Sequence, residues 1–200
     1  MKINSNTVSF GQRIPIAKGS VIDSKNNNKL TPVTVYQLDC CDISDAISLS
    51  NAEGTWNLRS NIQSDMKDTY IKNCFDSTRG TDSRTYYILT SDSDDEILSM
   101  AETIRRMEDE NIRYIESRRD NRFKYSGQTM VATLGLDVLN KGKPHLGVEE
   151  PLPSAYDFYT KKCGFYAVND FLLQMDKKRI KKFIDSIPVD RKVQMLDVKI

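Results

Sequence analysis

The most informative segment of the sequence is Ser154-Ala155-Tyr156-Asp157-Phe158-Tyr159-Thr160-Lys161-Lys162-Cys163-Gly164-Phe165. Ser154, followed three residues later by Asp157, has the pattern of a capping box and predicts that a helix begins there. Ala155, Phe158 and Tyr159 recur at helical spacing and are expected to face the core. Gly164 is the residue type that commonly ends a helix in the left-handed conformation. The segment therefore predicts a short amphipathic helix that stops at Gly164.

A basic loop precedes a second informative helix, which is expected from about Gly127 to Leu139. The N-terminus of a helix presents unpaired N–H groups and a positive dipole end, both of which favour an anion. Gly127 lets a ligand approach the backbone closely. The loop has neither the ending of a Walker motif nor a Gly-x-Gly-x-x-Gly turn. A solvated basic loop is the alternative interpretation. The basic residues of the loop are Arg118, Arg119, Arg122 and Lys124.

Hydrophobic periodicity predicts alternating strands and helices around this loop. Strands are expected at about 34–38, 86–89, 97–104, 112–116, 145–148, 171–175 and 193–200, and helices at about 42–52, 57–75, 127–139, 154–163 and 176–187. The segment 97–104 fits a helix as well, and the strand is preferred. This order predicts an α/β protein with a single mixed, mostly antiparallel central sheet flanked by helices. We expect an N-terminal extension or hairpin at 1–30, one domain at 31–176, and a C-terminal helix and tail at 177–200 that pack on it.

Composition excludes several classes of function. The 200 residues carry a formal net charge of +1, which gives no general attraction to nucleic acid or to an anionic membrane. The four cysteines lack the spacing of metal ligands, and the chain has a single histidine, so no metal site is expected. The polar N-terminus and the absence of a long apolar run predict a soluble, cytoplasmic protein with reduced thiols.

The two informative segments, in this order of elements, resemble the GNAT superfamily of acyl-CoA-dependent N-acyltransferases. In that family an Arg/Gln-x-x-Gly-x-Gly/Ala loop opens a helix and holds the pyrophosphate of coenzyme A (CoA). A later Ala-x-x-Phe-Tyr-x-Lys-x-Gly-Phe helix lies against the thiol end. The resemblance covers about residues 33–176 and implies acetyl-CoA as the co-substrate.

The resemblance also implies the residues of the site. The implied cofactor-binding residues are Arg118, Ser126, Gly127, Gln128, Thr129, Met130 and Val131. Thr129 and Val131 stand where the family has small residues, Ser126 replaces the basic or amide residue, and Tyr159 and Gly164 are one residue further apart than usual.

For catalysis, the resemblance implies that Tyr159 is the general acid that protonates the leaving thiolate. Glu116 and Glu102 are the carboxylates best placed by element order to act as the base. The alternatives are a core role for Tyr159 and surface strand positions for the two glutamates. His145 is a further candidate base by its pKa, although an exposed or capping role suits it better.

Two hypotheses of different classes follow. The first is a bacterial N-acetyltransferase that moves an acetyl group from acetyl-CoA to a primary amine of an unidentified small-molecule or peptide acceptor. The second is a non-catalytic binding protein of the same fold with a degenerate CoA site. A V-shaped gap between the strands at 112–116 and 145–148 is the structural signature expected of the first. A monomer and a homodimer are both open.

Overall fold

The computed structural model describes residues 13–38, 84–118 and 122–197, together with Ile47, Leu49 and Asn51. Apart from these three positions, the helices predicted at 42–52 and 57–75 lie outside the described residues, as does the loop predicted at 76–83.

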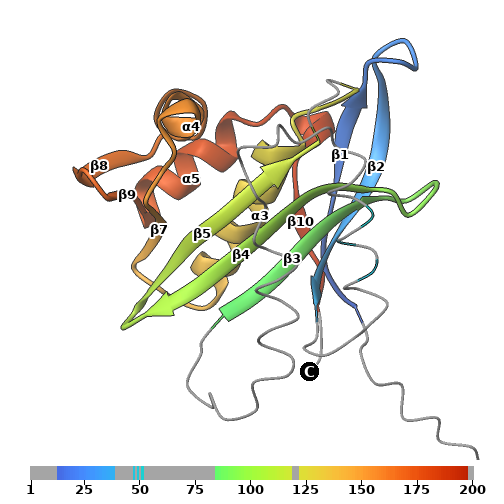
Figure 1. Ribbon diagram of the computed structural model, residues 1–200. Helices are drawn as coiled ribbons and strands as arrows, with labels where there is room; N and C mark the ends of the chain where they lie inside the picture. The colour runs from blue at the N-terminus through green and yellow to red at the C-terminus, as the bar shows by residue number, and fades with distance from the viewer. Residues whose placement is uncertain are drawn as a thin grey trace, which may run out of the picture.

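Within the described residues, ten strands form one sheet in the order β10-β1-β2-β3-β4-β5-β7-β9-β8, with β6 paired to β1. Every strand pair is antiparallel except β5 and β7, which are parallel. The strands are β1 (Ile14–Asp23), β2 (Lys29–Leu38), β3 (Arg84–Ser91), β4 (Ile97–Arg106), β5 (Asp109–Ser117), β6 (Phe123–Lys124), β7 (His145–Glu149), β8 (Tyr166–Asn169), β9 (Leu172–Asp176) and β10 (Gln194–Met195). The predicted mixed, mostly antiparallel sheet is confirmed (Figure 1).

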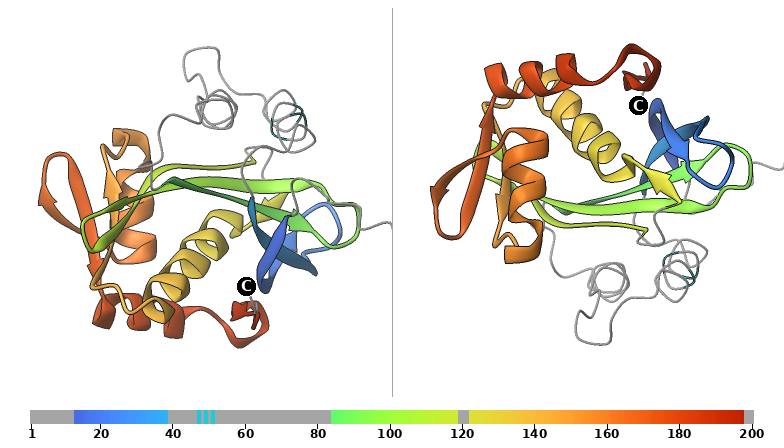
Figure 2. Two further views of the ribbon diagram at one scale, coloured as in Figure 1. Left: turned by 90° about the horizontal axis from the view of Figure 1, so that it is seen from below. Right: turned by 90° about the horizontal axis from the view of Figure 1, so that it is seen from above.

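Helices α3 and α5 cover the same face of this sheet (Figure 2). Their bounds are Ser126–Asn140 for α3 and Lys177–Ser186 for α5, while α4 spans Pro153–Asp157, the π-helical turn η1 spans Phe158–Cys163 and the 3-10 turn η2 spans Val189–Arg191. The apolar stripe of α3 and the Ile180 and Phe183 side chains of α5 are buried in the main core, as the periodicity predicts. The carboxylate of Asp176 accepts a hydrogen bond from the Arg179 N–H at 2.7 Å and thereby caps the start of α5.

The start of α4 differs from the predicted capping box. Leu152 is the N-cap, Pro153 follows in the first turn, and no side chain caps the helix. Because proline already has a helical φ and lacks an N–H, it begins the helix after Leu152, so the N-cap lies two residues before Ser154. At the other end, Gly164 has a φ of 86° and ends the helical segment as predicted.

The N-terminal hairpin is hydrogen-bonded into the central sheet. β1 pairs with β2 through the turn at Asn26–Asn28, and its end pairs with β6, the two-residue strand that leads into α3. The Arg122 guanidinium bonds the buried Asp23 carboxylate at 3.1 Å, and the Ser24 N–H donates to the Arg122 carbonyl at 2.7 Å. The hairpin therefore fixes the position of the α3 N-terminus.

A second small core lies on the face of the sheet opposite α3. It contains the described Leu49 together with Tyr86, Ile88 and Met100, and Tyr114 packs against it. Within 13–38, 84–118 and 122–197, no helix has both the length and the apolar character needed to cross a bilayer.

Candidate functional site

The parallel strands β5 and β7 separate along their length. Among the described residues they pair only at Glu110–Leu146, Asn111–Gly147 and Ile112–Val148. The register between β4 and β5 shifts at the next residue, Arg113, which is therefore a β-bulge that bends β5. Figure 1 shows β5 running away from β7 beyond this point. The V-shaped gap expected from the sequence is present.

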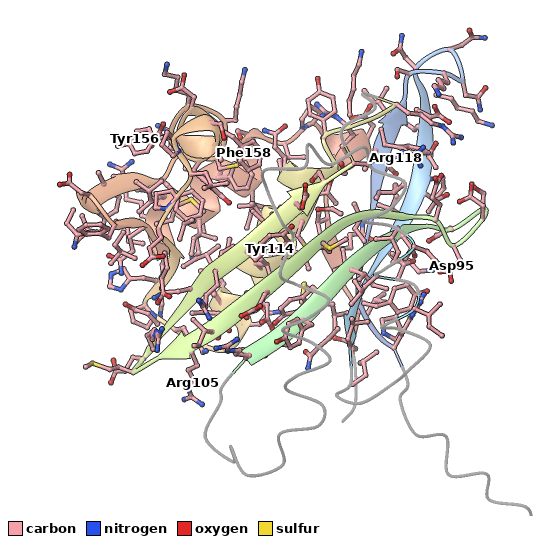
Figure 3. All side chains as sticks on the ribbon, viewed as in Figure 1. Asp95, Arg105, Tyr114, Arg118, Tyr156 and Phe158 are labelled. Atoms are coloured by element: carbon pink, nitrogen blue, oxygen red, sulfur yellow. The ribbon has the colours of Figure 1, made fainter. Side chains whose placement is uncertain are left out.

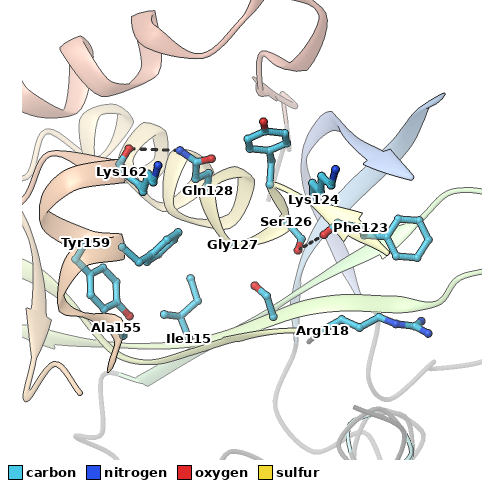
Figure 4. A pocket seen from close by; sticks show the side chains of 13 residues that line it. Ile115, Arg118, Phe123, Lys124, Ser126, Gly127, Gln128, Ala155, Tyr159 and Lys162 are labelled. Carbon is cyan, nitrogen blue, oxygen red and sulfur yellow. Dashed lines mark hydrogen bonds between the residues drawn. The ribbon is translucent and has the colours of Figure 1, made fainter. Parts of the chain in front are cut away.

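A cleft of about 480 Å³ opens at this gap, between β5, the start of α3 and the α4–η1 segment (Figure 4). Its walls are partly apolar, from Ile115, Phe123, Ala155 and Phe158, and its cationic side chains are Arg118, Lys124 and Lys162. None of its lining residues is acidic; the others are Ser117, Tyr125, Ser126, Gly127, Gln128 and Tyr159. A cleft with apolar walls, cations and no carboxylate suits an anionic ligand that carries an apolar arm.

The N-terminus of α3 supplies backbone donors to the cleft. The first helical hydrogen bond runs from the Thr129 N–H to the Tyr125 carbonyl at 2.9 Å, so the N–H groups at Ser126, Gly127 and Gln128 precede the helical ladder. A Cβ on Gly127 would lie 3.0 Å from the Ser117 Oγ, so α3 and β5 approach each other closely at Gly127. The site therefore combines N–H donors, a helix dipole and lysine side chains.

The β5 edge that faces the gap also carries backbone donors. The Arg118 N–H is bonded to the Leu98 carbonyl of β4 at 3.0 Å. Because N–H directions alternate along a strand, the N–H groups of Ile115 and Ser117 point away from β4, toward the gap. The backbone donors available at this edge therefore come from Ile115 and Ser117, since the Arg118 N–H is bonded to β4.

Tyr159 lies at the end of the cleft away from Arg118, with its hydroxyl directed toward the Ile115 side (Figure 4). Its ring is 5% exposed and packs edge-on against Phe158 and Phe165, at centroid distances of 5.2 and 5.6 Å. Burial raises the pKa of Tyr159 far above the ordinary value for a phenol, and the neighbouring Cys163 raises it further. Tyr159 therefore remains a protonated, potential proton donor across the physiological pH range.

No protein-family model matches the sequence, and no curated protein matches it. Solved structures do match. A protein from Desulfovibrio desulfuricans assigned to the GNAT family superposes with a TM-score of 0.56 at 12% identity, over 72% of this chain and 99% of that one. The aminoglycoside 6'-acetyltransferase type Ii superposes with a TM-score of 0.53 at 12% identity, over 72% and 96%. The ribosomal-protein-S18-alanine N-acetyltransferase from Escherichia coli gives 0.51 at 14% identity, over 72% and 93%. The chain has the GNAT fold.

Three of the cofactor-binding residues implied by the GNAT loop motif lie outside the cleft. Met130 and Val131 are fully buried in the main core, and the Thr129 methyl group lies 3.5 Å from the Cβ position of Gly19 on β1. Because these side chains point away from the cleft, their size does not narrow it. Ser126 lines the cleft, but its side chain is turned to the Phe123 carbonyl at 3.4 Å.

In this GNAT fold the Arg118 side chain is held by contacts with Glu96 and Phe123. Its guanidinium forms an ion pair with Glu96 and lies 5.8 Å from the Phe123 ring centroid, at the end of the cleft away from Tyr159 (Figure 4). Lys124 and Lys162 have no ion pair with the described residues and supply cationic charge. Lys162 was not among the residues predicted for cofactor binding, although its position three residues after Tyr159 places it on the same helix face.

The extra residue between Tyr159 and Gly164 is accommodated by the π-helical turn. Phe158–Cys163 forms this wider turn, and the Phe165 N–H closes it by donating to the Tyr159 carbonyl at 3.1 Å. Such a turn is the usual structural result of a single inserted residue in an α-helix. The departure from the GNAT motif therefore leaves Tyr159 in the cleft.

Glu116 and Glu102 lie on the opposite face of the sheet from α3. Side chains alternate along β5, so Ile115 and Ser117 face the cleft while Glu116 faces the second core. Glu116 accepts a hydrogen bond from the Tyr114 hydroxyl, which lies on the same face of β5. Glu102 is directly opposite Tyr114 in the β4–β5 register. The thickness of β5 thus separates the two predicted carboxylates from the cleft that contains Tyr159.

The surroundings of the two carboxylates differ. Glu102 is 3.4 Å from the Arg84 guanidinium and 3.7 Å from that of Arg113. The Arg113 guanidinium also lies 3.8 Å from Glu149, at the end of β7. Burial alone would raise the pKa of Glu149, but hydrogen bonds from Arg106 and Asn111 outweigh it and lower that pKa. Glu102 is therefore part of an ion-pair network across the sheet.

His145 lies at the other end of β7 from the gap, where Nδ1 is 2.9 Å from the Asp109 carboxylate. Figure 3 shows Arg105 and Arg118 at opposite ends of the central strands. His145 therefore contacts Asp109 and does not line the cleft. Within the described residues no group of three or more His, Cys, Asp or Glu side chains is arranged to hold a metal ion.

Proposed function

We propose that this chain is an acyl-CoA-dependent N-acyltransferase that moves an acetyl group from acetyl-CoA to a primary amine. The observation that carries the proposal is the cleft itself, with Lys124 and the helix N–H groups toward one end and protonated Tyr159 at the other. CoA has the matching chemistry, because its phosphates are anionic and its pantetheine arm is long and largely uncharged.

The residues that would hold acetyl-CoA are assigned from this geometry. Lys124 and the N–H groups of Gly127 and Gln128 bind the phosphates, since charged hydrogen bonds and a helix N-terminus both favour them. Ile115, Phe158 and the N–H groups of β5 line the path of the pantetheine arm. Lys162 closes the same cleft from η1, where its carbonyl accepts a 3.4 Å hydrogen bond from the Gln128 amide.

Acyl transfer forms a C–N bond to the acceptor and breaks the C–S bond of the thioester. The N–H groups of Ile115 and Ser117 stabilise the negative charge that develops on the carbonyl oxygen. Tyr159 donates its proton to the sulfur as the thiolate leaves. Glu116 takes the proton of the attacking amine from the opposite face of β5, directly or through a water molecule. Return of that proton to Tyr159 through solvent restores the enzyme.

Two further properties belong to this proposal. The acceptor is a small molecule or a peptide with a primary amine, approaching on the face of the sheet that carries Glu116 and Tyr114. The Cys163 thiol is buried and forms no disulfide. This supports a cytosolic location, since disulfides form mainly in oxidising compartments outside the cytosol.

The test is an acetylation screen. Purified protein is incubated with acetyl-CoA and a panel of amines that includes polyamines, aminoglycosides, amino acids and peptides, and released CoA thiol and acetylated product are both quantified. The proposal expects equal amounts of thiol and amide with at least one amine. CoA binding without turnover on any amine class would instead favour the non-catalytic binding protein.

A further inference from the structure

The C-terminal segment of the chain reaches the N-terminus of α3. After α5, the 3-10 turn η2 and strand β10 return across the molecule, and β10 pairs with β1 at Ala17 and Lys18. The buried Val193 side chain lies 3.6 Å from the Cβ position of Gly19, next to the Thr129 methyl group. The backbone on both sides of Arg191 is thus anchored, by the Arg191 N–H to the Pro188 carbonyl at 2.9 Å and by β10.

Arg191 is placed by this anchoring over the residue that caps α3. Its guanidinium carbon lies 3.8 Å from the centroid of the Tyr125 ring, close enough for a cation–π contact. Tyr125 itself has a φ of 75° and presents its ring at the helix start, 40% exposed. No carboxylate in the described residues forms an ion pair with Arg191. A stacked guanidinium keeps its in-plane N–H donors available, since the ring occupies only its face.

A small recess of about 110 Å³ lies between Arg191 and the start of α3. Tyr125 and Gln128 line both this recess and the main cleft, so the two hollows adjoin across these residues. No acidic residue lines the recess. The N–H of Gln128 belongs to the first turn of α3 and precedes the helical ladder. Guanidinium and helix donors therefore converge on one recess that adjoins the cleft and that Tyr159 does not line.

We propose that Arg191 binds a phosphate group of the acyl-CoA and takes the part of the basic or amide residue that Ser126 replaces in the loop motif. The inference rests on the proposed function. It assigns the recess to the phosphates of the nucleotide end, because Tyr159, the proposed acid at the thiol, lines the cleft and not the recess. The phosphate is either the diphosphate or the phosphate on the ribose 3'-hydroxyl, which share one chemistry. A guanidinium is suited to both, because its fork of donors matches phosphate oxygens.

The test measures calorimetric affinities of the wild type and of Arg191→Gln for CoA, 3'-dephospho-CoA and pantetheine. Loss of a charged hydrogen bond of this kind predicts a CoA affinity about 10-fold lower or more. Pantetheine affinity should be unchanged within twofold, because pantetheine carries no phosphate. If the mutation weakens CoA but not 3'-dephospho-CoA, the contact is to the 3'-phosphate; if both weaken equally, it is to the diphosphate.

Two control variants separate binding from folding. Arg179→Gln removes another arginine that stacks on a tyrosine, 4.8 Å from Tyr166, but outside the cleft, and should leave CoA affinity within twofold of wild type. Arg191→Lys keeps the charge and should recover part of the affinity. Wild-type CoA affinity in Arg191→Gln, or an equal loss for CoA and pantetheine, would overturn the inference while leaving the proposed function standing. Failure of the wild type to bind CoA would overturn both.

Discussion

At the scale of single residues, the two faces of β5 divide the proposed chemistry. Tyr159 reaches the α3 side of the strand and Glu116 the other side, so one residue is placed for the donor and one for the acceptor. Their surroundings match these roles. Tyr159 is buried among aromatic rings and keeps its proton, whereas Glu116 receives a hydrogen bond from Tyr114.

The Tyr159→Phe variant tests the proton donor. Phenylalanine preserves the edge-on ring packing, so the fold and the affinity for acetyl-CoA should be unchanged. We expect kcat to fall by about 10²–10⁴-fold, the usual contribution of a positioned acid. Since burial raises the pKa of Tyr159, wild-type kcat should not decline up to about pH 10, the ordinary value for tyrosine. A kcat within threefold of wild type would remove Tyr159 from the mechanism.

Glu116→Gln and Glu102→Gln form a matched pair that tests the base. Glu116→Gln should lower kcat by about 10²-fold or more near neutral pH and recover activity as pH rises, because the free amine then forms in solution. Glu102→Gln breaks contacts with Arg84 and Arg113 and should lower the melting temperature more than Glu116→Gln does. The pH–rate profiles of both variants measure the loss and recovery of kcat, and their thermal melts measure the change in melting temperature. The reverse pattern would identify Glu102 as the base.

At the scale of elements, the sequence predicted most of the site-forming structure because its signals are local. The stripe of α3, the stop at Gly164 and the strand at 112–116 depend on spacing and on residue type within one segment. The bulge at Arg113 and the ion pair of Arg118 with Glu96 depend on neighbours distant in sequence, so no local pattern shows them. The same reason explains why Arg191 was missed. The π turn and Lys162 do have a local signal, namely the extra residue between Tyr159 and Gly164 and the spacing of Lys162 from Tyr159.

Gly164 tests the π-helical turn. Its φ of 86° is a left-handed backbone conformation, which residues with a Cβ adopt only at a cost. Gly164→Ala should therefore lower the free energy of unfolding by about 1–2 kcal/mol. Gly142→Ala is the matched control, because Gly142 has a φ of 69° and no atom within 4 Å of its Cβ position, remote from the cleft. Both variants should lose similar stability in chemical denaturation, but only Gly164→Ala should lower kcat. Equal kcat values in the two would show that the turn does not position Tyr159.

At the scale of the whole molecule, both ends of the described chain support the start of α3. The N-terminal hairpin holds β6 through Asp23 and Arg122, and the C-terminal segment packs on β1, where Val193 and Thr129 both lie against the Cβ position of Gly19. These long-range contacts explain how an α3 N-terminus without a side-chain cap is held in place. The phosphate site proposed here is therefore built by segments separated by most of the sequence.

The Asp23–Arg122 contact makes this support depend on pH. The hydrogen bond from Arg122 lowers the pKa of Asp23 in spite of the opposing effect of burial. A depressed carboxyl pKa stabilises the fold above the unfolded-state value near 4 and loses this contribution as pH falls through the folded value. We expect the melting temperature of the wild type to fall more steeply than that of Asp23→Asn between pH 5 and about pH 2. Parallel curves would contradict a stabilising role for the pair.

Calorimetric titration of CoA into the wild-type protein tests the proposed cofactor site without any choice of acceptor, because binding depends on the cleft alone. We expect one CoA per chain with a dissociation constant below about 1 mM, and binding should be weakened by added salt and by the double substitution Lys124→Ala with Lys162→Ala. We also expect CoA to bind more tightly than pantetheine, since the phosphates meet Lys124 and the helix N–H groups. Absence of binding at millimolar CoA, or equal affinity for CoA and pantetheine at low salt, would contradict the proposed cofactor site.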